Sequence, residues 1–447
     1  MSAGARRFFA EYAWLGGHRA AELVLIATDA GVISEVSTGV DCPPDAVRLP
    51  GLVLPGLANA HSHAFHRALR GHSHRGGGSF WTWREDMYAV AGALDPERYY
   101  ALARATYAEM ALAGITCVGE FHYLHHDRDG ARYGEANVMG EVLIAAAHDA
   151  GIRITLLDTC YLAGGFGRPL EGAQRRFGDG DVEGWAARAA GLTGAAHARV
   201  GAAIHSVRAV PADQLAAVAT WARERGVPLH FHLSEQTAEN DACLAAHGRT
   251  PTALLEDHGA LGPRSCAVHA THLSPEDIGT LGGTRTTVCL CPSTERDLAD
   301  GIGPARALAS AGAPLALGSD SHAIIDGFEE TRALELGERL ARHSRGHFSA
   351  AELLSAATVA GHTCLGWPEA GQIAPGAPAD LIAVGLDSVR LAGARPDTLL
   401  ESVIFAAGAP DVAEVIVGGR TVVADGRHQL LPDVAGALAE AIAALEA

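Results

Sequence analysis

The sequence contains no lysine, and all 34 of its basic residues are arginine. This absence excludes Schiff-base catalysis by lysine, phosphate-binding loops that depend on a lysine, and any centre in which a carbamylated lysine bridges two metal ions. Acidic residues outnumber the arginines, so the formal net charge is −18. Nucleic acid and anionic membranes would repel such a chain, and we expect neither as a partner.

Long hydrophobic runs are also missing. No stretch reaches the roughly 18 apolar residues of a membrane span, and the start of the chain is too polar and aromatic for a signal peptide. We therefore expect a cytoplasmic protein whose eight scattered cysteines are reduced. Cys289 and Cys291 lie in an apolar run, where small core residues are a better interpretation than metal ligands.

The middle of the chain alternates short apolar runs with stretches rich in alanine, leucine, glutamate and arginine. This pattern indicates strands alternating with helices, and about eight strands suffice for a closed parallel barrel. The expected strands are 52–60, 115–121, 152–158, 199–205, 227–233, 265–270, 286–291 and 314–320, and the expected helices include 96–113, 211–225 and 328–342.

Both ends of the chain instead show short strands separated by glycine-containing turns, at 21–27, 32–36, 47–49, 380–384 and 412–423. Neither end has enough apolar surface to fold alone, so we expect the two to pack together. The predicted fold class is α/β: a (β/α)8 TIM barrel of residues 56–370, with a small β-sandwich domain formed from residues 1–55 and 371–447. A helix at 434–445 would pack or mediate an oligomer contact, and we expect a homodimer.

His61 and His63 follow directly after the first expected barrel strand. Residues i and i+2 of an extended strand point to one face, so these two imidazoles can converge on one ion at the mouth of a barrel. A second His-Ser-His sequence, at 72–74, follows an Arg-Gly pair and precedes a glycine run. No strand is expected before it, so we interpret it as a loop.

Three other expected strands end in residues suited to metal-assisted hydrolysis. His232 ends the fifth strand and is a better ligand candidate than His230, which we expect to be buried or to support the site. Glu235 lies just beyond it, where a carboxylate can move protons. His269 ends the sixth strand and Asp320 the eighth. Because barrel active sites lie at the carboxyl ends of the strands, the agreement of four strands predicts a site there.

His61, His63, His232 and Asp320 would leave an open position for water on a zinc-like ion, although iron and cobalt also suit this set. Such an ion brings the pKa of water from about 16 to near 7. Glu235 would then take a proton from water and deliver it to departing ammonia, and His269 would orient the nucleophile or stabilise the tetrahedral centre. The lack of lysine favours the single-metal deaminase variety.

Residues 55–63, Pro-Gly-Leu-Ala-Asn-Ala-His-Ser-His, resemble the opening motif of the amidohydrolase superfamily, and the resemblance extends over essentially the whole chain. Three strings, at 61–65, 79–85 and 120–126, are similar to the formimidoylglutamate deiminase family of histidine degradation. The resemblance implies hydrolysis of N-formimidoyl-L-glutamate to N-formyl-L-glutamate and ammonia with one divalent metal ion, most simply Zn²⁺. It also implies roles for particular residues: His61, His63, His232 and Asp320 as metal ligands, Glu235 and His269 as catalytic groups, and Arg84, Tyr123, His205 and Arg208 as substrate contacts.

A small anionic amidine fits the arginines that the resemblance selects. Arg84 and Arg208 offer planar forks to the two carboxylates of a glutamate moiety, and Tyr123 could add a hydroxyl donor. The chain departs from the family at one position, where His66 stands in place of the glutamine that commonly follows His-Ser-His-Ala-Phe. If His66 contacts the substrate, it bears on which amidine is preferred, whereas the metal chemistry would be unaffected.

Two alternatives remain. Another member of the same superfamily, such as an imidazolonepropionase-like ring opener or an aminopurine deaminase, would act on a flat heterocycle and would need stacking aromatics and amide partners rather than two arginines. A metal-binding scaffold without catalysis would show gaps at Glu235, His269 or Asp320, and all three residues are present.

Overall fold

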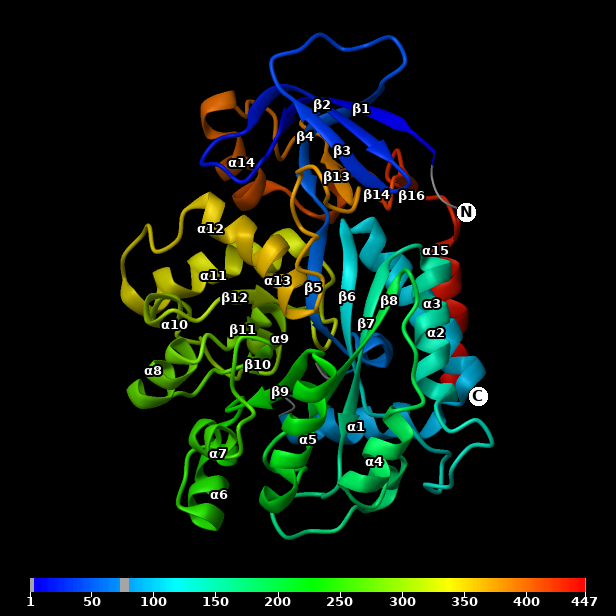
Figure 1. Cartoon of the computed structure of the whole chain (residues 1–447), viewed down its shortest axis with the longest axis vertical. Helices are drawn as coiled ribbons and strands as arrows, with labels where there is room; N and C mark the ends of the chain where they lie inside the picture. The colour runs from blue at the N-terminus through cyan, green and yellow to red at the C-terminus, as the bar shows by residue number, and fades with distance from the viewer. Residues whose placement is uncertain (1–3, 73–79, 447) are drawn as a thin grey trace.

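A nearly closed sheet of eight parallel strands forms the centre of the larger part of the molecule (Figure 1). We analysed a computed structural model, which describes residues 4–72 and 80–446. The strands follow chain order around the sheet: β5 (Leu57–Ser62), β6 (Ile115–His122), β7 (Arg153–Cys160), β8 (Ala198–Ile204), β9 (Leu229–Leu233), β10 (Ser265–His269), β11 (Thr287–Leu290) and β12 (Leu315–Leu317). A parallel bridge between Ser62 and Asp320 joins the last strand to the first. The predicted barrel is confirmed.

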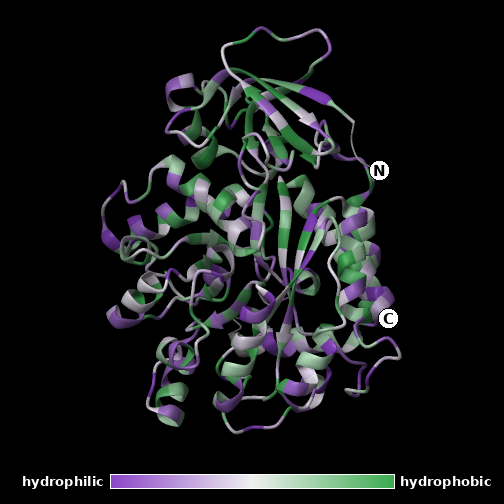
Figure 2. Ribbon diagram, viewed as in Figure 1, coloured by the Kyte–Doolittle hydropathy of each residue, from purple (hydrophilic) through white to green (hydrophobic). Residues whose placement is uncertain are grey.

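Helices surround the barrel strands, as Figure 1 shows. They include α1 (Phe80–Ala93), α2 (Pro96–Leu112), α3 (Val138–Ala150), α4 (Val182–Ala189), α5 (Ala212–Arg225), α6 (Thr237–His247), α7 (Pro251–Asp257), α8 (Pro275–Gly283), α9 (Pro292–Asp297), α10 (Ala305–Ala311), α11 (Gly327–Arg342), α12 (Ala350–Ser355) and α13 (Gly361–Cys364). Figure 2 shows many hydrophobic residues along the central strands, whereas the surrounding helices carry both hydrophobic and hydrophilic residues, as expected for helices with one face against the barrel.

The two ends of the chain pack together in one small β-domain, as predicted, and their strands form a single mixed sheet. Its order is β16-β15-β14-β13-β4-β1-β2-β3. These strands are β1 (Arg6–Ala13), β2 (Ala21–Asp29), β3 (Val32–Ser37), β4 (Val47–Pro55), β13 (Leu381–Val384), β14 (Val412–Val417), β15 (Arg420–Ala424) and β16 (Arg427–His428). The antiparallel pairing of β13 with β4 joins the two ends of the chain. The residue boundaries predicted for the two domains remain our proposal.

The run at 52–60 is two strands rather than the single barrel strand we predicted. The chain leaves the small sheet at Pro55, at the end of β4, and enters the barrel at Leu57, at the start of β5. Gly56 lies between them, where a Cβ atom would come within 2.1 Å of Oγ1 of Thr116. The residues on both sides of Gly56 are hydrophobic, so the sequence does not indicate where the chain passes from one sheet to the other.

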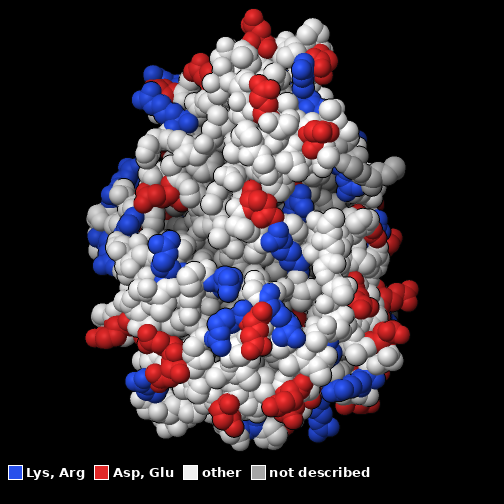
Figure 3. All heavy atoms as spheres, in the orientation of Figure 1, with Lys and Arg blue, Asp and Glu red and all other residues white. Residues whose placement is uncertain are grey.

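The C-terminal helix α15 (Val434–Glu446) packs against α2 on the outside of the barrel (Figure 1). This contact agrees with the packing role that we expected for the C-terminal helix. The homodimer remains a prediction. None of the helices in the described ranges is long and apolar enough to cross a membrane. On the face shown in Figure 3, arginine and acidic side chains are interspersed, and the negative net charge is not gathered in one patch there.

A buried arginine forms ion pairs with two aspartates. Arg188 donates from Nη1 to Asp158 at 2.8 Å and from Nε to Asp179 at 3.0 Å, and all three side chains are buried. Burial alone would raise the pKa of Asp158, but Arg188 outweighs it and holds that pKa below its usual value. Removing one partner of such a cluster leaves an uncompensated buried charge.

We therefore expect Arg188→Met to lower the free energy of unfolding by about 3–5 kcal/mol at pH 7. The folded pKa of Asp158 is depressed, so the stability it contributes is present above the unfolded pKa of about 3.9 and is lost as the pH falls through the folded value. The difference between wild type and variant should therefore shrink in acid. Urea unfolding at pH 7 and at about pH 3, below the unfolded pKa, measures this. The exposed pair Arg296–Glu329 provides the control, because Arg296→Met should cost less than about 1 kcal/mol.

Candidate metal and active site

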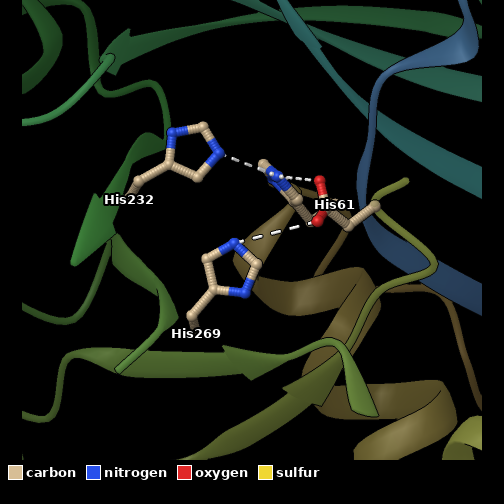
Figure 4. A group of neighbouring side chains, drawn as sticks. His61, His232 and His269 are labelled. Atoms are coloured by element: carbon tan, nitrogen blue, oxygen red, sulfur yellow. Dashed lines mark hydrogen bonds and ion pairs between the residues drawn. The ribbon is translucent and has the colours of Figure 1, made fainter. Parts of the chain in front are cut away.

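Three imidazoles and a carboxylate converge at the carboxyl end of the barrel. Figure 4 shows His61, His232 and His269 pointing toward one another. Nε2 of His61 lies 3.1 Å from Nε2 of His232 and 3.2 Å from Oδ1 of Asp320. Ligand atoms of these four residues all lie within 4.8 Å of one another, and His63 forms a second such group with His66 and the same Asp320. The cluster could therefore hold a metal ion.

Backbone carbonyls determine which nitrogen two of the imidazoles present to this cluster. Nδ1 of His63 donates to the carbonyl of Phe121, and Nδ1 of His232 donates to that of His205, both at 2.9 Å. Each ring therefore keeps its lone pair on Nε2, and that of His63 lies 3.4 Å from Oδ1 of Asp320. A lone pair directed at a carboxylate is repelled unless a cation lies between the two groups, so these residues fit a metal ion.

Burial keeps the imidazoles neutral, whereas the neighbouring histidines keep the aspartate charged. Burial lowers the pKa of His61, His63 and His232. Burial alone would raise the pKa of Asp320, but its contact with His61 outweighs this effect and holds that pKa well below its usual range. Neutral imidazole and ionised carboxylate are the forms that bind zinc and similar ions.

His269 has different surroundings, because carboxylates lie on both sides of its ring. Nε2 is 3.7 Å from Oε1 of Glu235, and Nδ1 is 3.5 Å from Oε1 of Glu295. Burial alone would lower the pKa of His269, but Glu235, Glu295 and Asp320 together raise it to about 10. Burial also raises the pKa of Glu235, against the opposing effect of His269. An imidazolium and a carboxyl group in contact suit proton transfer and stabilisation of negative charge better than metal ligation.

The chain holds several of these residues in a strained backbone conformation. His269 has φ +67°, Asp320 φ +40° and Ser234, just before Glu235, φ +48°. Residues other than glycine rarely adopt this left-handed region, and such residues cluster at functional sites. Gly318 lets the short strand β12 approach β5, because a Cβ atom there would lie 2.8 Å from Cβ of His61.

The substrate residues predicted from the sequence line one pocket above the cluster. The pocket is formed by His63, His66, Trp83, Arg84, Met87, Tyr88, Tyr123, Tyr161, Phe177, His205, Arg208, His232, Glu235, His269 and Asp320. Nε2 of His66 lies 3.1 Å from the hydroxyl of Tyr123, and Nε of Arg84 donates to the hydroxyl of Tyr88 at 2.7 Å. His61 lies beneath this pocket, fully buried in the cluster. All eleven predicted site residues therefore lie at one end of the barrel.

Other histidines and cysteines that could suggest metal sites have structural partners. His230 contacts the carbonyl of Cys364 at 3.0 Å and lies within 4.8 Å of the thiols of Cys266 and Cys364. Burial keeps the Cys266 thiol protonated by raising its pKa well above the usual value. The eight cysteines are free, and Cys289 and Cys291 belong to the buried apolar core, as predicted. In the second His-Ser-His sequence, His72 lies in a turn, and residues 73 and 74 lie outside the described residues.

Sequence reasoning missed several residues that support the site. Glu120 accepts from the hydroxyl of Ser62 at 2.7 Å, and that hydroxyl contacts Nε2 of His322 at 3.2 Å. Nδ1 of His322 contacts the hydroxyl of Ser319, which accepts from Asn59 at 2.6 Å. This buried chain of polar groups ties β5, β6 and the end of β12 together around the cluster. Its members resemble ordinary core polar residues in the sequence, so only their meeting in space reveals them.

The fold and the cluster at its carboxyl end define a barrel hydrolase with a site able to hold a metal ion. The amidohydrolase family model matches residues 52–422. Formimidoylglutamate deiminase of Pseudomonas aeruginosa is 40% identical over 412 residues, which cover 89% of this chain and 90% of that protein. The 8-oxoguanine deaminase of the same organism is 32% identical over 404 residues, covering 89% and 87%. An amidohydrolase structure from Brucella melitensis has a TM-score of 0.92 and 37% identity, covering 99% of this chain and 100% of that one.

The chain belongs to the amidohydrolase family. The family resemblance stated from the motifs at 55–63, 61–65, 79–85 and 120–126 is confirmed, and with it the prediction of a hydrolase that acts on carbon–nitrogen bonds.

Proposed function

We propose that this protein hydrolyses N-formimidoyl-L-glutamate to N-formyl-L-glutamate and ammonia, and that His61, His63, His232 and Asp320 hold a single divalent ion, most simply Zn²⁺. The observation that carries the proposal is that Arg84 and Arg208 line the same pocket as Glu235 and His269. Two guanidinium groups suit a substrate with two carboxylates. The 40% identity to a formimidoylglutamate deiminase over most of both chains supports it further.

The roles of the protein groups follow from their positions. A bound divalent ion would supply a Lewis acid and would lower the pKa of water, so that hydroxide becomes available near neutral pH. Glu235 takes the proton from the water molecule that attacks the formimidoyl carbon. Glu235 returns this proton to the terminal nitrogen and then passes on a second proton, from the new hydroxyl group. The carbon–nitrogen bond breaks, the nitrogen leaves as ammonia, and the hydroxyl oxygen becomes the formyl carbonyl. His269, 3.7 Å from Glu235, stabilises the charge that develops at the tetrahedral carbon.

The assignment of His63 rather than His269 to the ion follows from the bonds that each ring makes. His63 donates from Nδ1 to the carbonyl of Phe121 and keeps the Nε2 lone pair for the ion. His269 lies between Glu235 and Glu295, which favour its protonated form. A protonated imidazole has no lone pair to bind a metal ion.

Incubation of the purified protein with N-formimidoyl-L-glutamate, followed by assays for ammonia and N-formylglutamate, tests the function. Both products should appear in equal amounts. Formamide and glutamate would show that a different bond is cut, and no reaction would contradict the proposal.

A second candidate function, deamination of a flat heterocycle, has an observation in its favour. Tyr123, Tyr161 and Phe177 line the pocket together with the arginines, and aromatic walls can stack on a purine. The relative named for 8-oxoguanine supplies the comparison substrate. A higher kcat/KM for 8-oxoguanine than for N-formimidoyl-L-glutamate would favour this candidate.

We expect Arg208→Met to raise the KM for N-formimidoyl-L-glutamate with little change in kcat. Arg208 is a partly buried guanidinium in the pocket wall, and losing its charged hydrogen bonds to a carboxylate should cost about 1.5–3 kcal/mol of binding, or roughly 10- to 150-fold in KM. Steady-state kinetics measure both constants. An unchanged KM would remove Arg208 from the set of carboxylate-binding residues.

A further inference from the structure

A buried carboxylate on α6 joins the substrate-binding and proton-transfer sides of the pocket. Glu239 is only 3% exposed. Its Oε2 accepts from Nε of Arg208 at 2.6 Å, and its Oε1 accepts from the backbone N–H of Ser234 at 2.9 Å. Both oxygens are thus committed, one to a pocket guanidinium and the other to the residue that precedes Glu235.

The bond to Ser234 acts at a strained position. Ser234 has φ +48°, a conformation that costs free energy for a residue other than glycine and persists only where surrounding contacts hold it. A hydrogen bond from its N–H to an ionised carboxylate is stronger than one to a neutral acceptor. Glu239 therefore helps to hold the turn from which the Glu235 side chain enters the pocket.

The bond to Arg208 orients a cation that would otherwise lie partly buried without a partner. The Arg208 side chain is 20% exposed, and burying a guanidinium without a counter-charge is costly. Because Glu239 occupies the Nε edge, the two Nη groups remain for a substrate carboxylate. The ion pair also places a negative charge beside the arginine before any substrate binds, so the guanidinium is already oriented when the carboxylate arrives.

We propose that Glu239 is a positioning residue with two contacts: it orients Arg208 for a substrate carboxylate, and it holds the turn that places Glu235. This inference rests on the proposed function and deepens it. The proposal predicts a substrate that carries both the anionic group and the scissile amidine on one molecule. Arg208 would bind the anionic group and Glu235 would act on the amidine, and Glu239 helps to position both residues. Glu239 itself takes no part in bond making or breaking.

The variant Glu239→Gln tests this proposal. Glutamine is of similar size but has one acceptor oxygen, so it can keep the bond to Arg208 or the bond to Ser234 but not both. We expect KM for N-formimidoyl-L-glutamate to rise about 10-fold and kcat to fall about 10-fold, because one of the two hydrogen bonds is lost and the other no longer has a charged acceptor. Asp241→Asn is the matched control, since Asp241 lies on the same helix, is exposed, and loses the same charge. The control should retain wild-type kinetics.

The double variant Arg208→Met/Glu239→Gln separates a positioning role from a general loss of stability. Once Arg208 is gone, the second substitution should not raise KM further, whereas the fall in kcat due to Glu239→Gln should persist. Multiplying losses in KM would overturn the role of Glu239 in orienting Arg208. Kinetics of Glu239→Gln equal to those of Asp241→Asn would also overturn it, whatever the melting temperatures.

Titration calorimetry with glutarate, a dicarboxylate that has no amidine, gives a readout that does not depend on turnover. Glu239→Gln should bind glutarate about 10-fold more weakly than Asp241→Asn does, because a factor of this size corresponds to the free energy of one charged hydrogen bond. Equal affinity would overturn the proposal. If the wild type binds glutarate but does not hydrolyse N-formimidoyl-L-glutamate, the proposed function fails and this comparison still decides the role of Glu239. A wild type that does not bind glutarate would overturn the carboxylate-binding role of Arg208 and the proposal together.

Discussion

Glu235→Gln should remove turnover while leaving the metal content of the protein unchanged. Glu235 is 8% exposed at the floor of the pocket, and its Oε1 lies 3.7 Å from Nε2 of His269. Glutamine fills the same space but cannot take a proton from water and return it to the leaving nitrogen. General acid–base groups contribute typically about 10²- to 10⁴-fold, and a loss of this size in kcat is the expected result.

Two measurements on the same preparation test the prediction, namely kcat for ammonia release and metal content by elemental analysis. Glu224→Gln, at an exposed position on α5, makes the same chemical change away from the pocket and should behave as wild type. Loss of the metal from Glu235→Gln with little change in rate would contradict the proton-transfer role and would suggest that Glu235 binds the ion instead.

The site could be predicted from the sequence where its residues end strands. His61, His232 and His269 each lie at or near the end of a parallel strand, so hydrophobic periodicity was enough to place them at one end of a barrel. Asp320 follows β12 by three residues rather than ending it, because the strand stops at Leu317 and the chain turns at Gly318. The left-handed conformation of Asp320, φ +40°, has no signal in the sequence.

Residues that support the site from helices could not be predicted. Glu239 on α6 and Glu295 on α9 occur in polar helical stretches of the kind that usually face solvent, and both are buried in the structure. Their partners, Arg208 and His269, are 31 and 26 residues away along the chain, so no local pattern links them. Glu295 closely follows the seventh barrel strand, but without the fold a surface glutamate is the simpler interpretation.

The strands of the small sheet could also be predicted only in part from the sequence. Strand β1 was not predicted, although it pairs with both β2 and β4 in the centre of the sheet. Its residues alternate imperfectly between buried and exposed, and the pairing shifts register between Ala10 and Tyr12. A bulge of this kind breaks the period of two on which strand prediction depends. The pairing of the two chain ends was predictable only from the argument that neither end could fold alone.

Removal of the metal should abolish activity and also lower the melting temperature. Without a cation, the Nε2 lone pair of His63 is directed at the Asp320 carboxylate, 3.4 Å away. The folded protein then carries the repulsion of these groups, whereas an ion that binds only the folded state at 1,000 times its Kd stabilises it by about 4.1 kcal/mol. Dialysis against dipicolinate, elemental analysis to show that the metal is gone, and a thermal melt test the second effect without any substrate.

Reconstitution with Zn²⁺, Fe²⁺ or Co²⁺ then tests whether one ion is enough. Ammonia release should return in proportion to metal bound and should reach its maximum at one equivalent, because the chain has no lysine to bridge a second ion. Asp320→Asn should bind the ion more weakly and recover less activity, since an amide oxygen is a poorer ligand than a carboxylate. Protein shown to be free of metal that still releases ammonia at the full rate would refute the role of this cluster. Activity that continues to rise to two equivalents would instead require a second ion, for which His66, in contact with the same aspartate as His63, is the nearest additional ligand.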